Sequence, residues 1–244
     1  MAEKHIIISQ KEPKLLTVYD SLSKKYGVNF TFKPFYHIEP LSSLEYRAQK
    51  LNILDHTAVV FSSRSAIDAF FKISEEHRIK IPEDMKYFCS TEIVANYLQK
   101  HIVYRKRKIF FGNGTAESII TAIGTKHVGE HFLIVACDSN KNELTDLMDK
   151  KGLKYTCALF IKSVLEDLSG VDFSKYDAAV LYNPSDVHSI LKTYPEFKQG
   201  NLKIISYGKS VVKALEEAHL NIAVAAPTPD IPSAAKAIEV LLSE

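Results

Sequence analysis

The chain has 244 residues, of which 46% are hydrophobic, and a formal net charge of +2. This length accommodates one large domain or two small ones, and the apolar content is sufficient for a packed core. The near-neutral charge excludes a general electrostatic attraction to nucleic acid or to an anionic membrane, so binding must come from local sites.

The N-terminal stretch "MAEKHIIISQ" meets polar residues too soon for the apolar core of a signal peptide. No run approaches the roughly 20 apolar residues that a membrane span needs. We therefore expect a cytoplasmic protein. The cysteines are Cys89, Cys137 and Cys157, and no CxxC pair occurs. This odd number and wide spacing argue against a disulfide framework and a zinc knuckle, and we expect reduced, mostly buried thiols.

Short β-rich runs alternate with segments of helical period along the whole chain, a pattern typical of parallel sheets covered by helices. The expected strands, in chain order, are residues 5–9, 28–38, 57–62, 85–89, 108–112, 131–137, 154–164, 177–182, 202–207 and 221–226. Nearly every one is followed by a helix-like stretch. Pro184 and Pro232 stand where helices are expected to begin, a position at which the missing N–H costs nothing.

The two halves of the chain repeat the same order of elements. Residues 57–73 match residues 177–193 in hydrophobic period and in turn residues. The first half carries an additional unit at 131–164, and its best match is the N-terminal segment 5–38. Because the second half lacks its own copy of this unit, we expect the N-terminal segment to supply it.

This match predicts an α/β fold of two similar parallel-sheet, flavodoxin-like domains joined by two extended crossings, with one domain discontinuous. The expected bounds are 1–34 plus 165–244 for the discontinuous domain, 39–156 for the inserted domain, and 35–38 and 157–164 for the crossings. In paired α/β domains, ligands bind in a cleft lined by the loops at the carboxyl ends of the strands.

One such loop stands out in "AVVFSSRSAIDAFF", where an apolar run stops at Ser62, Ser63 and Arg64 before helical spacing begins. A serine at this position can cap the helix. The free N–H groups of a helix start also favour an anion. The sequence leaves both interpretations open.

Three further motifs carry weaker signals. "HVGEH" at 127–131 fits a zinc-peptidase pattern, but Gly129 and the strand that follows place its histidines across a helix-to-strand junction, so we expect no metal site. "FFGNGTAES" at 110–118 lacks the third glycine or the lysine of a nucleotide loop and indicates a tight turn capped by Thr115. "YRKRK" at 104–108 has no neighbouring aromatic platform and is typical of a solvated face rather than a nucleic-acid site.

The order of "NILDHTAVVFSSRSAID", "MKYFC", "YLQKHIVYRKRKIFFG" and the late "APTP", on two permuted α/β domains, resembles uroporphyrinogen-III synthases, especially the Bacteroidetes-type members. The resemblance covers essentially the whole chain. It implies a lyase of tetrapyrrole (haem) biosynthesis that cyclises hydroxymethylbilane, a linear tetrapyrrole, with inversion of ring D and loss of water. It also implies that no metal or cofactor takes part.

The substrate of that family carries many carboxylates, which suit strand-end turns offering N–H groups, hydroxyls and cations. The resemblance therefore implies a set of substrate-contacting residues: Ser62, Ser63, Arg64, Ser90, Thr91, Asn183, Ser185, Lys209 and Ser210. Within this set, Arg64 is the expected carboxylate partner.

The chain departs from the family at several positions. Ile161 stands where the family has a tyrosine thought to assist departure of the hydroxyl, or Phe160 does if the register slips by one, so the catalytic group stays unknown. Asn183, Asp186 and Val211 replace a serine, a glycine and a threonine of the family turns. Asp186 would oppose a polycarboxylate unless its side chain points away.

These departures keep alternatives open. The first is a non-catalytic paralogue that binds a tetrapyrrole or another polyanion in the interdomain cleft. A hinge-bending small-ligand binding protein is the second. For the leading interpretation, a uroporphyrinogen-III synthase-type lyase, we expect a monomer that binds a small polycarboxylate, the linear tetrapyrrole, and neither nucleic acid nor a membrane.

Overall fold

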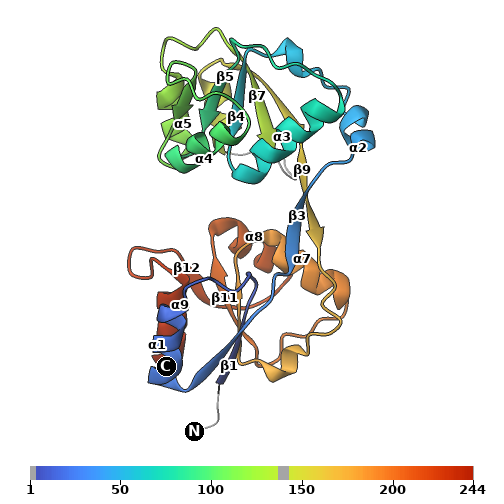
Figure 1. Ribbon diagram of the computed structural model, residues 1–244. Coiled ribbons are helices and arrows are strands. Elements are labelled where there is room, and N and C mark those ends of the chain that lie inside the picture. Colours follow the sequence, from blue (N-terminus) through green and yellow to red (C-terminus); the bar gives the residue numbers. More distant parts are fainter. Residues whose placement is uncertain (1–3, 137–142, 244) are drawn as a thin grey trace. The chain divides into compact units, whose positions relative to one another are not determined.

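The computed structural model describes residues 4–136 and 143–243. The chain divides into two compact units, shown in Figure 1. One, the discontinuous unit, comprises Met1–His37 and Val164–Glu244, and the other, the inserted unit, comprises Ile38–Ser163. No helix among the described residues is both long and apolar enough to cross a membrane.

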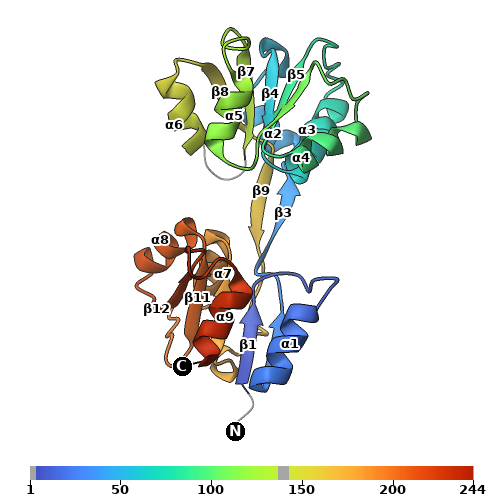
Figure 2. The same cartoon turned by 90° about the vertical axis from the view of Figure 1, so that its left-hand side faces the viewer.

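The discontinuous unit is built on a parallel sheet with strand order β12-β11-β10-β1-β2. Its strands are β1 (Lys4–Ile8), β2 (Val28–Phe32), β10 (Ala178–Leu181), β11 (Lys203–Tyr207) and β12 (Ile222–Ala226). Its helices are α1 (Thr17–Tyr26), η3 (Phe173–Lys175), α7 (Pro184–Thr193), α8 (Lys209–Glu217) and α9 (Ala234–Ser243). Helices α1 and α9 cover one face of this sheet and α7 and α8 the other (Figure 2).

The inserted unit has a second parallel sheet, with strand order β6-β5-β4-β7-β8. Its strands are β4 (Ala58–Phe61), β5 (Lys86–Cys89), β6 (Ile109–Phe111), β7 (His131–Ala136) and β8 (Lys154–Leu159). Its helices are α2 (Ser43–Ala48), η1 (Ile53–Asp55), α3 (Arg64–Glu76), α4 (Glu92–Tyr97), η2 (Leu98–Lys100), α5 (Ala116–Ile123) and α6 (Glu143–Lys150).

The two sheets have the same topology with a permuted chain. Counted from β1, the strands of the discontinuous unit lie in the flavodoxin-like order 2-1-3-4-5, and those of the inserted unit lie in the same order when counted from β7. Strands β7 and β8 therefore correspond to β1 and β2. This confirms the predicted fold class and explains the internal repeat.

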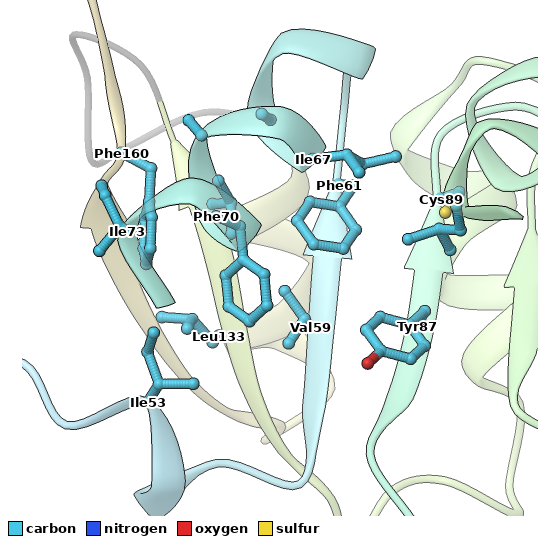
Figure 3. Packing of buried hydrophobic residues seen from close by; sticks show 14 of the residues in the cluster. Ile53, Val59, Phe61, Ile67, Phe70, Ile73, Tyr87, Cys89, Leu133 and Phe160 are labelled. Carbon is cyan, nitrogen blue, oxygen red and sulfur yellow. The ribbon is translucent and has the colours of Figure 1, made fainter. Parts of the chain in front are cut away.

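Helix α3 shows how apolar spacing builds the inserted unit. Ile67, Phe70 and Ile73 recur at helical spacing and are completely buried against the sheet. Figure 3 shows Phe70 between Phe61 of β4 and Phe160, with ring centroids 5.4 Å and 5.6 Å away. Truncating an aromatic side chain in such a core costs about 3–5 kcal/mol, so this contact holds α3 against its sheet.

The two long extended segments expected from the sequence each contain two strands. After β2, the chain continues into β3 (Tyr36–Pro40), and after β8 it continues into β9 (Ile161–Leu165). Strands β3 and β9 pair in a separate two-stranded sheet. Residues 157–159, expected in a crossing, lie in β8 instead, because they continue its pairing with β7.

The two described cysteines, Cys89 and Cys157, lie in strands, and their burial sets the pKa of each thiol. Cys89 is completely buried, and this burial raises the pKa of its thiol to about 12. Cys157 is half-buried, and burial also raises its pKa. Both are free thiols, whereas Cys137 lies outside the described residues.

Candidate functional site

In the inserted unit, the turn after β4 caps helix α3. Ser63 has extended backbone, and its Oγ accepts a hydrogen bond from the N–H of Ala66 at 3.1 Å. The capping interpretation of this serine is therefore confirmed. The N–H groups of Ser62, Arg64 and Ser65 have no acceptor within residues 4–136 and 143–243, so the helix start also keeps unpaired donors.

The next turn, after β5, is tied to the first one. Ser90 Oγ donates to the carbonyl of Ser62 at 3.0 Å, and the N–H of Ser90 donates to the carbonyl of Phe61 at 2.9 Å. Thr91 caps α4, its Oγ1 accepting from the N–H of Val94 at 3.3 Å. The predicted residues Ser62, Ser63, Ser90 and Thr91 thus belong to one hydrogen-bonded edge.

A third turn, after β6, completes this edge. The N–H of Gly114 donates to the carbonyl of Ser90 at 2.8 Å. Ser118 Oγ accepts from the N–H of Asn113 at 3.0 Å and lies where a Cβ at Gly112 would come within 2.1 Å of it, so position 112 requires glycine. Thr115 caps α5 as predicted. The tight-turn interpretation of this motif is confirmed.

Arg64 extends over an aromatic ring at this edge. Its guanidinium carbon lies 5.6 Å from the ring centroid of Tyr97, and this stacking orders the side chain without neutralising its charge. Tyr97 Oη donates to Asp68 Oδ2 at 2.8 Å, and Lys100 Nζ and His101 Nε2 lie 3.0 Å and 2.8 Å from Asp68 Oδ1. Asp68 is therefore engaged by other groups. Among the described residues, Arg64 has no carboxylate partner and can receive one from a ligand.

In the discontinuous unit, the turn after β10 is closed by an internal carboxylate. Asn183 caps α7, its Oδ1 accepting from the N–H of Ser185 at 2.9 Å. Asp186 completes a capping box and is completely buried. Its side chain points into the protein, so it presents no charge at the surface of the turn. Burial raises its pKa to about 6.

The partners of Asp186 come from two strand ends. Its Oδ2 accepts a hydrogen bond from Ser9 Oγ at 2.6 Å. The same oxygen accepts the N–H groups of Tyr182 at 2.8 Å and Asn183 at 3.0 Å. Ser9 was not predicted as part of the site. Its place just after β1, which neighbours β10, is the signal that could have identified it.

The adjacent turn, after β11, is open. Gly208 stands at the N-cap of α8 with φ 121°, in the left-handed region that favours glycine, and provides no side-chain cap. The N–H groups of Lys209 and Ser210 have no acceptor in the described part of the chain, and Ser210 is exposed at the start of the helix. Val211, which replaces a family threonine, is completely buried and contributes packing only.

The expected tyrosine position lies inside a core. Ile161 and Phe160 are 5% and 0% exposed, and both belong to the hydrophobic cluster of the inserted unit. The following residue, Lys162, pairs with Glu45 at 2.6 Å. Neither register therefore brings a proton donor to this position.

The remaining motifs lie away from the strand-end turns. His131 Nδ1 hydrogen-bonds to the carbonyl of Asp55 at 2.9 Å, whereas His127 Nδ1 lies 3.8 Å from Glu130 Oε1, so the two histidines face different partners. The basic run at 104–108 precedes β6 and lies at the amino end of its sheet.

A cavity of about 660 Å³ in the discontinuous unit also lies away from the strand-end turns. It is lined by Phe173, Tyr194 and Phe197 among others, between η3 and the end of α7. Because η3 precedes β10, this cavity lies at the amino edge of the sheet, opposite the predicted turns, and contains none of the predicted substrate-contacting residues.

Comparisons with known proteins give consistent results. The family model described as uroporphyrinogen-III synthase HemD matches residues 18–236. Uroporphyrinogen-III synthetase from Helicobacter pylori 26695 is similar with a TM-score of 0.59 and 15% identity, over 98% of this chain and 99% of that chain. No curated protein matches the sequence.

A mutant uroporphyrinogen III synthase from the extremely thermophilic bacterium Thermus thermophilus is similar with a TM-score of 0.56 and 11% identity, over 98% of this chain and 97% of that chain. At such low identities, the two structural similarities establish the fold. The family itself is established by the match of the family model to most of the chain.

Proposed function

Since the chain belongs to the uroporphyrinogen-III synthase family, we propose that it retains the family activity and cyclises hydroxymethylbilane with inversion of ring D and loss of water. The observation that carries this proposal is a pairing at a strand-end turn of each unit: open N–H donors lie beside a cation, Arg64 in one unit and Lys209 in the other, that forms no ion pair with any described residue. A substrate rich in carboxylates matches this chemistry.

In the inserted unit, Arg64 is the principal carboxylate partner. The planar guanidinium can bind a carboxylate through two parallel hydrogen bonds, and its stacking on Tyr97 limits the freedom lost on binding. The open N–H groups of Ser62 and Ser65 supply further donors. Ser63, Ser90 and Thr91 contact substrate from the same edge and hold these donors in place by capping and by the bond between Ser90 and Ser62.

In the discontinuous unit, Lys209 and Ser210 bind a carboxylate through the ammonium group, the hydroxyl and their two N–H groups. Asn183 and Ser185 contribute side-chain groups from the neighbouring turn. Asn183 Nδ2 and Ser185 Oγ have no hydrogen-bond partner in the described part of the chain, whereas Asn183 Oδ1 is engaged by the N–H of Ser185.

The chemical step proceeds without a side-chain acid at position 161. Loss of the hydroxyl as water leaves an azafulvenium-like cation, and the substituted carbon of ring D bonds to it to form a spiro intermediate. The bond from this carbon to its original bridging methylene then breaks, the released methylene cation bonds to the free α-carbon of ring D, and loss of a proton from that carbon restores the pyrrole. The protein contributes by holding the two ends of the linear tetrapyrrole in reacting geometry and by fixing the surrounding carboxylates, whose charge favours the cation. The proton for the departing hydroxyl comes from solvent or substrate, not from Ile161.

A coupled assay tests this proposal, with hydroxymethylbilane generated in place and the type I and type III isomers separated. An active synthase gives mainly type III above the no-protein control. The second candidate, a non-catalytic paralogue that binds a tetrapyrrole or another polyanion, is favoured by the apolar packing at Ile161. It predicts binding with only type I product. The cytoplasmic location and the monomeric state stay predictions.

A further inference from the structure

The turn between β10 and α7 has no free backbone donor. The N–H groups of Tyr182 and Asn183 both donate to Asp186 Oδ2, at 2.8 Å and 3.0 Å. The N–H of Ser185 donates to Asn183 Oδ1 at 2.9 Å, and the N–H of Asp186 donates to the carbonyl of Asn183 at 2.9 Å. Pro184 has no N–H. Every donor at this helix start is therefore either engaged within the chain or absent.

The comparable turns at the starts of α3 and α8 differ in this respect. Each keeps N–H groups without an acceptor in the described residues: those of Arg64 and Ser65 at the start of α3, and those of Lys209 and Ser210 at the start of α8. The α3 start is capped by a serine and the α8 start by a glycine, so neither contains an acidic capping group. Of these three turns, only the β10–α7 turn has backbone N–H groups that donate to an acidic side chain, that of Asp186.

The Asp186 carboxyl lies in the position that a bound anion takes at a helix start. It is completely buried, receives two backbone N–H groups and the Ser9 hydroxyl, and forms no ion pair with any described residue. Its second oxygen, Oδ1, is buried without a hydrogen-bond partner among the residues that the structure describes. A ligand carboxylate at the same turn would find no free backbone N–H group, only the side-chain groups Asn183 Nδ2 and Ser185 Oγ, which suit a neutral polar group.

We propose that Asp186 is a built-in carboxylate that fills the anion position of the β10–α7 turn, so that this turn excludes substrate carboxylates and accepts a neutral polar group through Asn183 Nδ2 and Ser185 Oγ. Asp186 is then a specificity-determining positioning residue. The identity of the substrate in this inference rests on the proposed function. The exclusion of carboxylates from the turn is independent of it.

The test is a titration of the ¹⁵N-labelled full chain with propionate, following the backbone amide resonances of Tyr182 and Asn183. In the unmodified protein these resonances do not move with propionate. In Asp186→Ala, and in Asp186→Ser as a second variant, the freed amides shift in a saturable way. Asp186→Asn keeps an oxygen acceptor for the same donors, so in this variant the amides of Tyr182 and Asn183 stay insensitive to propionate. The contrast with the alanine and serine variants shows whether the response comes from freed N–H groups or from a general loss of structure.

Glu45→Ala is the matched control, because Glu45 is the acid of the capping box at α2 in the inserted unit. It leaves Tyr182 and Asn183 insensitive to propionate. Saturable shifts of these amides in the unmodified protein overturn the inference, as does their insensitivity in the folded alanine and serine variants. Failure of the proposed function appears separately, as an absence of type III product while the amides respond as expected.

Discussion

Ser9 Oγ donates a 2.6 Å hydrogen bond to Asp186 Oδ2, which joins the carboxyl end of β1 to the first turn of α7 across 177 positions of sequence. The bond links the N-terminal segment to the C-terminal segment within the discontinuous unit. Among the described residues, it also supplies the one side-chain donor to a buried carboxyl whose other donors are backbone N–H groups. The orientation of Asp186 therefore depends on the N-terminal strand.

Ser9→Ala removes that donor and leaves the buried carboxyl with backbone partners only. Loss of a hydrogen bond to a buried charged group lowers the free energy of unfolding by about 1.5–3 kcal/mol, measured by urea denaturation at pH 7. Ser21→Ala is the control, because Ser21 Oγ bonds to the carbonyl of Thr17 on an exposed helix face. Equal stability of the two variants would contradict the role given to Ser9.

Asp186 also makes stability depend on pH. Its pKa is raised from 3.8 to about 6 in the folded protein, so the folded state binds more protons than the unfolded state between these values. Its contribution to stability is present below pH 4 and is lost as the pH rises through 6. A shift of this size corresponds to roughly 3 kcal/mol.

Asp186→Asn removes this titration. We expect the stability of the unmodified protein to fall relative to the asparagine variant as the pH rises from 4 to 7, in denaturant unfolding at both pH values. A difference between the two proteins that does not change with pH would show that Asp186 keeps an ordinary pKa.

Arg64→Ala removes the unneutralised cation at the start of α3. A hydrogen-bonded pair involving a charged group contributes about 1.5–3 kcal/mol, so we expect KM for hydroxymethylbilane to rise roughly 10-fold to 100-fold. Lys72→Ala is the control, since Lys72 lies on the same helix but pairs with Glu76. An unchanged KM in Arg64→Ala would remove Arg64 from the binding site.

Ile161→Ala tests whether position 161 packs or reacts. Truncation of a buried isoleucine lowers the free energy of unfolding by about 2–5 kcal/mol, and Ile161→Val lowers it by about 0.5–1.5 kcal/mol. Below the unfolding temperature of each variant, we expect kcat per folded molecule to stay unchanged. A loss of kcat without a loss of stability would instead place this side chain against the substrate.

The fold was predictable because local signals agreed with it. Apolar runs marked the strands, and serine or threonine at strand ends marked the helix starts, as Ser63 and Thr115 show. The direction of Asp186 was not predictable, since an acid in the first turn of a helix can face solvent or the sheet. Which direction it takes depends on Ser9, whose distance in sequence hides the contact.

The residues around the family tyrosine position were difficult for a different reason. Strand alternation predicts that one of Phe160 and Ile161 faces outward. Both are buried, because the chain passes from β8 to β9 at Phe160 and the alternation is interrupted there. The contact between Arg64 and Tyr97 could not be predicted either, because the two residues belong to different helices. Hydrophobic period shows which face of a helix a residue lies on, but not which side chain of another helix it contacts.

We expect this chain to close hydroxymethylbilane to the type III isomer without a tyrosine at position 161. The most direct measurement is the fraction of type III product in the coupled assay as the concentration of the protein is raised. If the chain is an active synthase, this fraction increases with protein concentration until type III predominates. A product that stays type I at every concentration, from a folded protein, would contradict this expectation.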